Sequence, residues 1–140
     1  MYEFLLKAHS GLRHLVLLGL VVVVVKSLIG MLNKQPYSSL DNKLGLFTFI
    51  FTHTQLLLGL LLFFVSPFVK FGGNTSDETT YWTFGHSVGM LAAVVLITLA
   101  RTTSKRMTND ADKHKRMFIF NFVALVVIIA VIAISGRKIL

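Results

Sequence analysis

Long apolar blocks are the feature that most constrains what this chain can fold into. Four of them occur, over Phe4–Leu32, Leu44–Val69, Tyr81–Ala100 and Met117–Ser135. Each is long enough for the roughly 20 helical residues that cross a hydrocarbon core of about 30 Å. Because irregular backbone is not stable in lipid, the segments between the blocks are expected outside the bilayer. The sequence therefore predicts an all-α fold, a four-transmembrane-helix up-down bundle that forms one integral membrane domain over residues 1–140.

The composition agrees with this prediction. Hydrophobic residues make up 54% of the chain and the mean hydropathy is +0.73, whereas soluble domains average roughly 45–50% apolar residues. The first block has the outline of a signal peptide, because the apolar run Leu15–Val25 follows Lys7, Arg13 and His14. A secretory signal also needs a small-residue cleavage site, and Lys26–Gly30 is a poor one. We therefore expect the first block to stay in the protein as a helix.

The charged residues predict the orientation of the bundle. With four spans, both termini lie on one side of the membrane. That side, with the loop 70–80, carries five cations and three anions, a net charge of +2, and the opposite side carries nine cations and three anions, a net charge of +6. Short loops rich in Lys and Arg stay in the cytoplasm. Both termini are therefore expected on the outer side.

The net charge of +8 also raises the possibility of nucleic-acid binding. Orientation and contact with anionic lipid headgroups account for most of the excess, so no nucleic-acid partner is expected. The absence of Cys excludes disulfides, thiol catalysis and iron–sulfur ligation. The sequence contains no Gly-rich phosphate loop, no G-x-S-x-G and no H-E-x-x-H motif, which removes the common signatures of nucleotide-binding proteins, serine hydrolases and zinc proteases.

Five histidines remain as candidates for chemistry, and ionisable residues inside a membrane are by default a hypothesis for a functional site. His9 and His86 each lie about five residues, or ~7.5 Å, inside the outer ends of the first and third helices. These two helices are diagonal in a simple up-down bundle. The two imidazoles are therefore expected at one level, facing each other across the bundle centre, which is the arrangement of two axial ligands on a b-type haem.

The neighbours of these two histidines allow two interpretations each. Gly85 and Gly89 remove side-chain bulk beside His86, as a flat porphyrin requires, but two small residues four apart also mark close packing of two helices. Arg13 follows His9 by four residues, on roughly the same helix face one turn deeper. It would pair a haem propionate there or extend to the outer interface.

A weaker pair lies toward the cytoplasm. His53 is on the second helix and His114 immediately precedes the fourth, so they too belong to diagonal helices. Their expected heights differ by roughly 13 Å. One iron therefore requires that the second helix begin in water near Asn42, and that the fourth helix be tilted or start near Asp110, with Asp110 or Asp112 as its N-cap. The alternatives are a hydrogen-bonded structural imidazole at His53 and a solvated one at His114, within the basic run 113–116. The fourth helix is accordingly predicted over about 110–135.

The remaining histidine and the polar residues beside the four candidates complete the prediction. His14 lies about 140° around the helix from His9, so the two cannot serve one face, and His14 is expected at the interface or near a quinone or a haem edge. Candidate hydrogen-bond partners of the ligand rings stand next to them in the sequence: Ser10, Thr52, Thr54, Gln55 and Ser87.

Four segments, HSGLRH, FTHTQLLLGLLLFFVSP, YWTFGHSVGM and DKHKRMFIF, resemble a family of small four-helix bacterial membrane proteins labelled cytochrome b-like. The resemblance covers nearly the whole chain and is similar in outline to the cytochrome b561 class, although this chain is shorter than a six-helix member. It implies a multi-pass protein of the bacterial inner (cytoplasmic) membrane that binds haem b through iron ligands His9, His53, His86 and His114.

One or two haems b in the bundle core would make the chain an electron-transfer cytochrome rather than a substrate-converting enzyme. Two haems, one toward each face, would form a wire across the bilayer. Apart from the lipid bilayer, the expected partners are a quinone or a redox protein, and a homo-oligomer or a larger membrane complex remains open. Two other classes compete: an accessory subunit of a membrane assembly with structural histidines, and a small transporter.

Overall fold

The computed structural model describes residues 2–65 and 85–134, and its secondary structure consists of long helices. Four helices account for most of these two ranges: α1 (Tyr2–Leu32), α2 (Ser39–Val65), α4 (His86–Ser104) and α5 (Asp110–Ile134). Each is long and apolar enough to cross a membrane. The expected all-α bundle is confirmed, and the chain is a multi-pass membrane protein.

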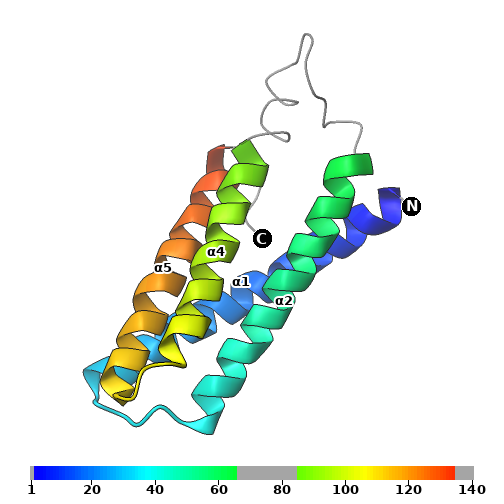
Figure 1. Ribbon diagram of the computed structural model, residues 1–140. Helices are drawn as coiled ribbons and strands as arrows, with labels where there is room; N and C mark the ends of the chain where they lie inside the picture. Colours follow the sequence, from blue (N-terminus) through cyan, green and yellow to red (C-terminus); the bar gives the residue numbers. More distant parts are fainter. Residues whose placement is uncertain (1, 66–84, 135–140) are drawn as a thin grey trace.

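The helices pack as two antiparallel pairs, α1 with α2 and α4 with α5 (Figure 1). α1 also packs along α5, and α2 makes a smaller contact with α4. α1 and α4 are therefore diagonal, as are α2 and α5, which confirms the arrangement expected from a simple up-down bundle. The two pairs lie close together at the end that holds the connections 33–38 and 105–109, here called the connection end. They diverge toward the opposite end, the terminal end, where α1 begins and α5 ends (Figure 1).

Two helices begin at capping residues in the connections. Ser38 and Asp41 form a reciprocal cap at the start of α2, because the Ser38 backbone N–H and hydroxyl donate to Asp41 Oδ2 at 2.8 and 2.9 Å, and the Asp41 N–H faces Ser38 Oγ at 3.3 Å. Such a capping box satisfies amide groups that a helix start leaves unpaired. α2 therefore begins five residues before the predicted Leu44.

α5 begins at Asp110, as expected, but its cap is Asn109. Asn109 Oδ1 accepts hydrogen bonds from the N–H groups of Ala111 at 2.8 Å and Asp112 at 3.4 Å. The prediction of Asp110 or Asp112 as the N-cap is therefore wrong by one residue or more, because either Asx side chain suits the position and only the local backbone selects one.

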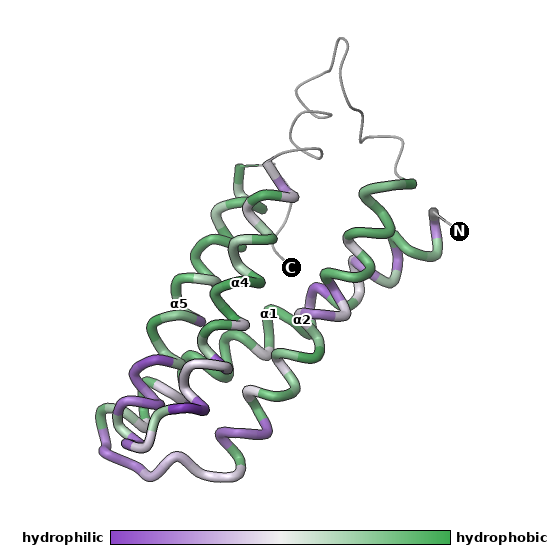
Figure 2. Tube along the Cα trace, in the orientation of Figure 1, coloured by the Kyte–Doolittle hydropathy of each residue, from purple (hydrophilic) through white to green (hydrophobic). Residues whose placement is uncertain are grey.

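The other predicted boundaries differ by a few residues. α1 ends at the predicted Leu32, and α4 extends to Ser104, four residues beyond the predicted Ala100. The predicted extension of the second helix over 66–69 and the predicted start of the third at 81–84 lie outside the described residues. Figure 2 shows hydrophilic residues gathered at the connection end, with a second group along the N-terminal third of α1.

The apolar core belongs to three of the four helices. Its buried residues come from α1, α4 and α5: Val16, Leu17, Leu20, Ala93, Ile97, Ala124, Ile128 and Ile132. α2 faces the bundle with a different kind of surface. Its inward positions follow the alternating spacing of four and three that lets one helix lie along another, and most are small or polar: Asp41, Gly45, Thr48, Thr52, Gln55, Gly59 and Leu62.

Candidate functional site

The structure brings His9 of α1 and His86 of α4 together near the terminal end. Their ring centroids are 6.2 Å apart and the ring planes meet at 68°. The two helices are diagonal, so the imidazoles meet across the bundle rather than along one helix pair. Both side chains are half-buried. The expectation that these two rings meet at one level across the bundle is therefore met, and the rings meet edge-on.

The separation of the two rings suits two imidazoles that bind one metal ion from opposite sides. An imidazole nitrogen lies about 2 Å from a bound first-row metal ion. The ring centroid lies about 1 Å beyond the nitrogen, so two centroids on opposite sides of one ion are about 6 Å apart. Imidazole nitrogens are also the usual protein ligands of haem iron. The centroid separation of the pair is therefore within the range for two imidazoles on opposite sides of one metal ion.

α2 holds His9 from the side. The ring lies over Gly59, where an added Cβ would come within 3.4 Å of His9 Cε1 and 3.9 Å of His9 Nδ1. One turn before Gly59, the Gln55 amide Nε2 donates a 2.8 Å hydrogen bond to the backbone carbonyl of His9. The Nδ1 edge of the imidazole thus faces α2, and Gln55 fixes the backbone that carries it.

Unpaired polar atoms gather around His9. His9 Nδ1, Arg13 Nε, Thr52 Oγ1 and Gln55 Oε1 are buried and find no hydrogen-bond partner within the described ranges. Buried polar groups are almost always hydrogen-bonded. Since α1 and α2 run antiparallel side by side, these four atoms lie within about two turns of one another along the helix pair. The surroundings of His9 therefore have unused capacity to bind a polar or charged group.

Gly89 takes the helix-packing role rather than opening space beside His86. An added Cβ there would collide with the Val131 side chain of α5. Close approach of two helices at a small residue is the ordinary use of glycine in membrane bundles. Gly85 is exposed and precedes α4 as its N-cap residue, so neither glycine is directed at the space between His9 and His86.

His53 is a hydrogen-bonded structural histidine in this structure. Its Nδ1 lies 2.8 Å from the carbonyl of Phe49 and its Nε2 lies 3.2 Å from the Thr98 hydroxyl of α4. Because a carbonyl only accepts, Nδ1 carries the proton. Nε2 is then an acceptor beside the Thr98 hydroxyl, whose one proton is shared with the Val94 carbonyl 2.8 Å away. The imidazole links α2 to α4 at the point where these two helices are in contact.

His114 is fully buried, with 0% of its surface exposed. Its Nε2 donates to the carbonyl of Gln35 at 3.1 Å, and its ring packs on Tyr37 with 5.2 Å between ring centroids. The ring also occupies the space above Gly30, where an added Cβ would come within 2.5 to 2.7 Å of three ring atoms. The alternative of a solvated histidine is therefore wrong, because Gly30 opens a site for the ring between α1 and α5.

His53 and His114 do not form a pair. His53 is directed at α4, whereas His114 is directed at α1 and the 33–38 connection. Their positions relative to the starts of α2 and α5 differ by ten residues, which is about 15 Å along the helices. A shared iron would need both rings at one level, so the second predicted ligand pair is not brought together.

The other predicted residues divide between the bundle interior and its surface. His14 is exposed on the outside of the bundle, consistent with an interfacial position. Thr54 is exposed and its hydroxyl donates to its own helix at the Ile50 carbonyl. Ser10 and Ser87 are half-buried. Only Thr52 and Gln55 among the candidate partners face the interior beside His9.

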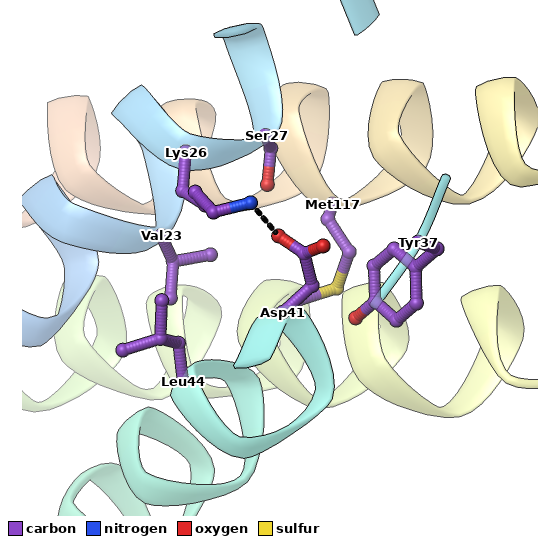
Figure 3. Close-up of a pocket in the computed structure, with 7 residues that line it drawn as sticks. All are labelled: Val23, Lys26, Ser27, Tyr37, Asp41, Leu44 and Met117. Carbon is purple, nitrogen blue, oxygen red and sulfur yellow. Dashed lines mark hydrogen bonds and ion pairs between the residues drawn. The ribbon is translucent and has the colours of Figure 1, made fainter. Parts of the chain in front are cut away.

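A partly buried ion pair at the connection end was not predicted. Lys26 of α1 forms a 2.8 Å ion pair with Asp41 of α2, beside a cavity of about 10 Å³ that Ser27, Tyr37 and Met117 help to line (Figure 3). Burial and the negative charge of Asp41 raise the pKa of the Tyr37 hydroxyl, which keeps it neutral. The signal in the sequence is a basic residue in the last two turns of the first apolar block and an acidic residue just before the second block.

Arg101 is a more deeply buried cation of this end, with 8% of its surface exposed. Its guanidinium lies 5.8 Å from the centre of the Phe49 ring, and Nη1 donates a 3.4 Å hydrogen bond to the Asn42 carbonyl. These contacts join α4 to the start of α2. Together with the Lys26–Asp41 pair they tie the ends of three helices.

Comparison with known proteins does not extend this description. No family model, no curated protein and no solved structure matches the chain. Within the described residues, no three His, Cys, Asp or Glu side chains gather closely enough to hold a metal ion. The His9–His86 pair offers two potential ligands, one fewer than such a group.

Proposed function

We propose that this chain is a b-type haem protein that binds one haem between His9 of α1 and His86 of α4 and passes electrons within the membrane. The observation that carries the proposal is the 6.2 Å separation of two imidazole rings that diagonal helices present to each other. The resemblance of four sequence segments to cytochrome b-like proteins supports it. The same resemblance supports a location in the bacterial inner membrane.

Three residues of the chain would hold the haem. His9 and His86 each contribute a neutral imidazole nitrogen. Arg13, one turn deeper than His9, has an unpaired buried Nε and would pair with a propionate carboxylate through a charge-assisted hydrogen bond. Bound haem would supply an iron that changes between the ferric and ferrous states, with a potential set by its ligands and their burial.

One haem, rather than two, is the number that the histidine contacts favour. His53 has both ring nitrogens engaged, and His114 is enclosed by Gly30, Tyr37 and the Gln35 carbonyl. His114 Nδ1 has no hydrogen-bond partner among the described residues, but the ring is fully enclosed and its Nε2 is bound to Gln35, so we assign structural roles to both histidines. A single haem near the terminal end does not make a wire across the bilayer, so we propose electron exchange with a quinol in the membrane or with a redox protein docked at that end.

The deciding measurement is an absorption spectrum of the purified protein, oxidised and dithionite-reduced, after expression with ample haem. We expect a sharp reduced α band and about one haem per chain, as bis-histidine ligation produces. His9→Ala and His86→Ala should each lose the haem. His14→Ala and His53→Ala are the matched controls and should keep it.

Failure to fold is separated from loss of a ligand by rescue. His9→Gly should regain the reduced spectrum when free imidazole is added, because the small ligand can occupy the vacated position. A colourless wild-type protein would contradict the proposal and favour an accessory subunit with structural histidines. Haem retained in both His9→Ala and His86→Ala would contradict the ligand assignment.

A further inference from the structure

Arg116 of α5 is a cation that its neighbours hold in place without neutralising it. Its guanidinium carbon lies 5.0 Å from the centre of the Phe120 ring, and Nη1 donates a 3.3 Å hydrogen bond to Thr103 Oγ1 of α4. The Thr103 hydroxyl donates its own proton to the Leu99 carbonyl, so its oxygen accepts from Arg116 without conflict. Asp112 lies one turn earlier on α5, but within the described part of the chain no carboxylate forms an ion pair with Arg116.

The position of Arg116 along α5 places it at the edge of the apolar part of the membrane. No charged residue follows it in this helix. At roughly 1.5 Å per residue, the remainder of α5 over 117–134 spans about 27 Å, close to the thickness of a hydrocarbon core of about 30 Å. The guanidinium therefore lies at the depth of the lipid phosphates on the side of the connection end.

The surface next to this cation, toward the middle of the membrane, is apolar and exposed. Ile119 and Val123 lie three and seven residues after Arg116, on the same face of α5. Leu99 lies one turn before Thr103 on α4. All three side chains are exposed on the outside of the bundle. A fixed positive charge thus borders an apolar surface along two adjacent helices, which is the complement of a phospholipid with its headgroup at Arg116.

We propose that Arg116, held by Thr103 and Phe120, binds the phosphate of an anionic phospholipid on the outer face of α4 and α5. A guanidinium has five N–H donors, and the contact with Thr103 uses one, which leaves donors for a bidentate contact with phosphate oxygens. The connection end, where hydrophilic residues gather (Figure 2), has a net charge of +6 and attracts such lipids in general. Arg116 is the member of this group whose geometry suits one bound headgroup.

The inference does not depend on haem and is tested on the purified full chain in a mild detergent. The melting temperature should rise when phosphatidylglycerol is added and should not rise with the neutral phosphatidylcholine. Arg116→Gln keeps a donor for Thr103 but removes the charge, and it should bind phosphatidylglycerol about 10- to 100-fold more weakly, the effect of losing a hydrogen bond to a charged group.

Lys43→Gln is the matched control, because Lys43 is an exposed cation at the same end and the charge change is the same. Loss of one cation from general attraction should weaken binding about fivefold at most. Equal losses in Arg116→Gln and Lys43→Gln would overturn the inference, since the lipid would then respond only to the total charge of the connection end.

Thr103→Val provides a second variant that leaves every charge in place, so the inference stays testable even if Arg116→Gln does not fold. It removes the hydroxyl that holds the guanidinium and should weaken phosphatidylglycerol binding about 2- to 10-fold. Unchanged binding would overturn the arrangement assigned to Arg116. Inorganic phosphate at the same concentration should not raise the melting temperature, and equal stabilisation by phosphate would show a site for a free anion instead of a lipid.

Discussion

Small residues decide where polar side chains lie in this bundle. Gly30 is the clearest case, because the buried ring of His114 fills the volume where its side chain would be. Gly19 has the same relation to Thr48, whose Oγ1 lies 2.8 Å from an added Cβ. Interiors are close-packed, so such a position cannot take even one methyl group without movement of its neighbour.

Gly30→Ala is therefore expected to destabilise the protein by about 1–3 kcal/mol, the usual cost of overpacking. Gly11→Ala is the matched control, because no atom lies within 4 Å of an added Cβ there and replacing a helical glycine gains about 0.5–1 kcal/mol. Thermal unfolding in a mild detergent compares the two. Equal melting temperatures for Gly30→Ala and Gly11→Ala would contradict the placement of His114.

The double variant Gly30→Ala/His114→Ala tests the contact itself. Removing the ring removes the overlap, so adding Gly30→Ala to His114→Ala should cost less than adding it to the wild type. Such non-additivity is the signature of two residues in contact. Additive losses would show that the two positions do not share one volume.

α1 ends without a glycine at the position that takes the left-handed conformation. Lys34 has a positive φ of 53°, and the Gln35 N–H donates to the Gly30 carbonyl at 2.9 Å. This is a Schellman motif, with Lys34 as the left-handed residue that glycine usually provides. Pro36 follows and prevents the helix from resuming. The motif also turns the Gln35 carbonyl toward His114, so a helix end and a buried histidine depend on each other.

Lys34→Gly should stabilise the protein by about 0.5–1 kcal/mol, because the left-handed conformation costs a residue with a side chain about 1–2 kcal/mol and glycine loses part of this gain through its freer unfolded chain. Lys43→Gly is the control with the same chemical change. Lys43 is exposed within α2, where glycine costs about 1 kcal/mol. The two melting temperatures should move in opposite directions, and movement in the same direction would contradict the helix end described for α1.

At the scale of the whole molecule, α2 is attached differently from the other helices. The apolar core is formed by α1, α4 and α5, whereas α2 presents mostly glycine, hydroxyl, amide and carboxylate groups to the bundle. In lipid there is no hydrophobic driving force between helices, so close packing at small residues and hydrogen bonds hold them together. The proposed haem ligand His9 lies on this polar seam between α1 and α2.

The Lys26–Asp41 pair fastens one end of that seam. Asp41→Asn keeps a side chain that can accept the Ser38 hydrogen bonds but removes the charge opposite Lys26. Breaking a fully buried pair costs about 3–5 kcal/mol, and since the Lys26 side chain is 29% exposed, we expect a smaller loss of roughly 1–3 kcal/mol. Asp112→Asn is the exposed control and should leave the unfolding free energy almost unchanged. Equal stability of the two variants would contradict the stabilising role of this ion pair.

The orientation of the whole bundle in the membrane follows from its charges. The connection end carries the larger positive charge, so it should face the cytoplasm. The chain has no cysteine, which allows single cysteines to be introduced as reporters. Lys105→Cys should react with an impermeant thiol reagent only after the cells are broken open. Lys7→Cys should react while the membrane that holds the protein is still intact. The reverse pattern would show that the termini are inside.

The sequence by itself determined the number of described helices, their approximate lengths and the shared level of His9 and His86. These properties are local, because the length of an apolar run and the rise of about 1.5 Å per residue need no knowledge of neighbours. Only the tertiary structure decided which direction each side chain takes. It turned His53 to Thr98, enclosed His114 above Gly30, and set Gly89 against Val131. Lipid is as apolar as leucine, so an apolar pattern does not distinguish the lipid-facing side of a membrane helix from the packed side, and contacts between helices must do so.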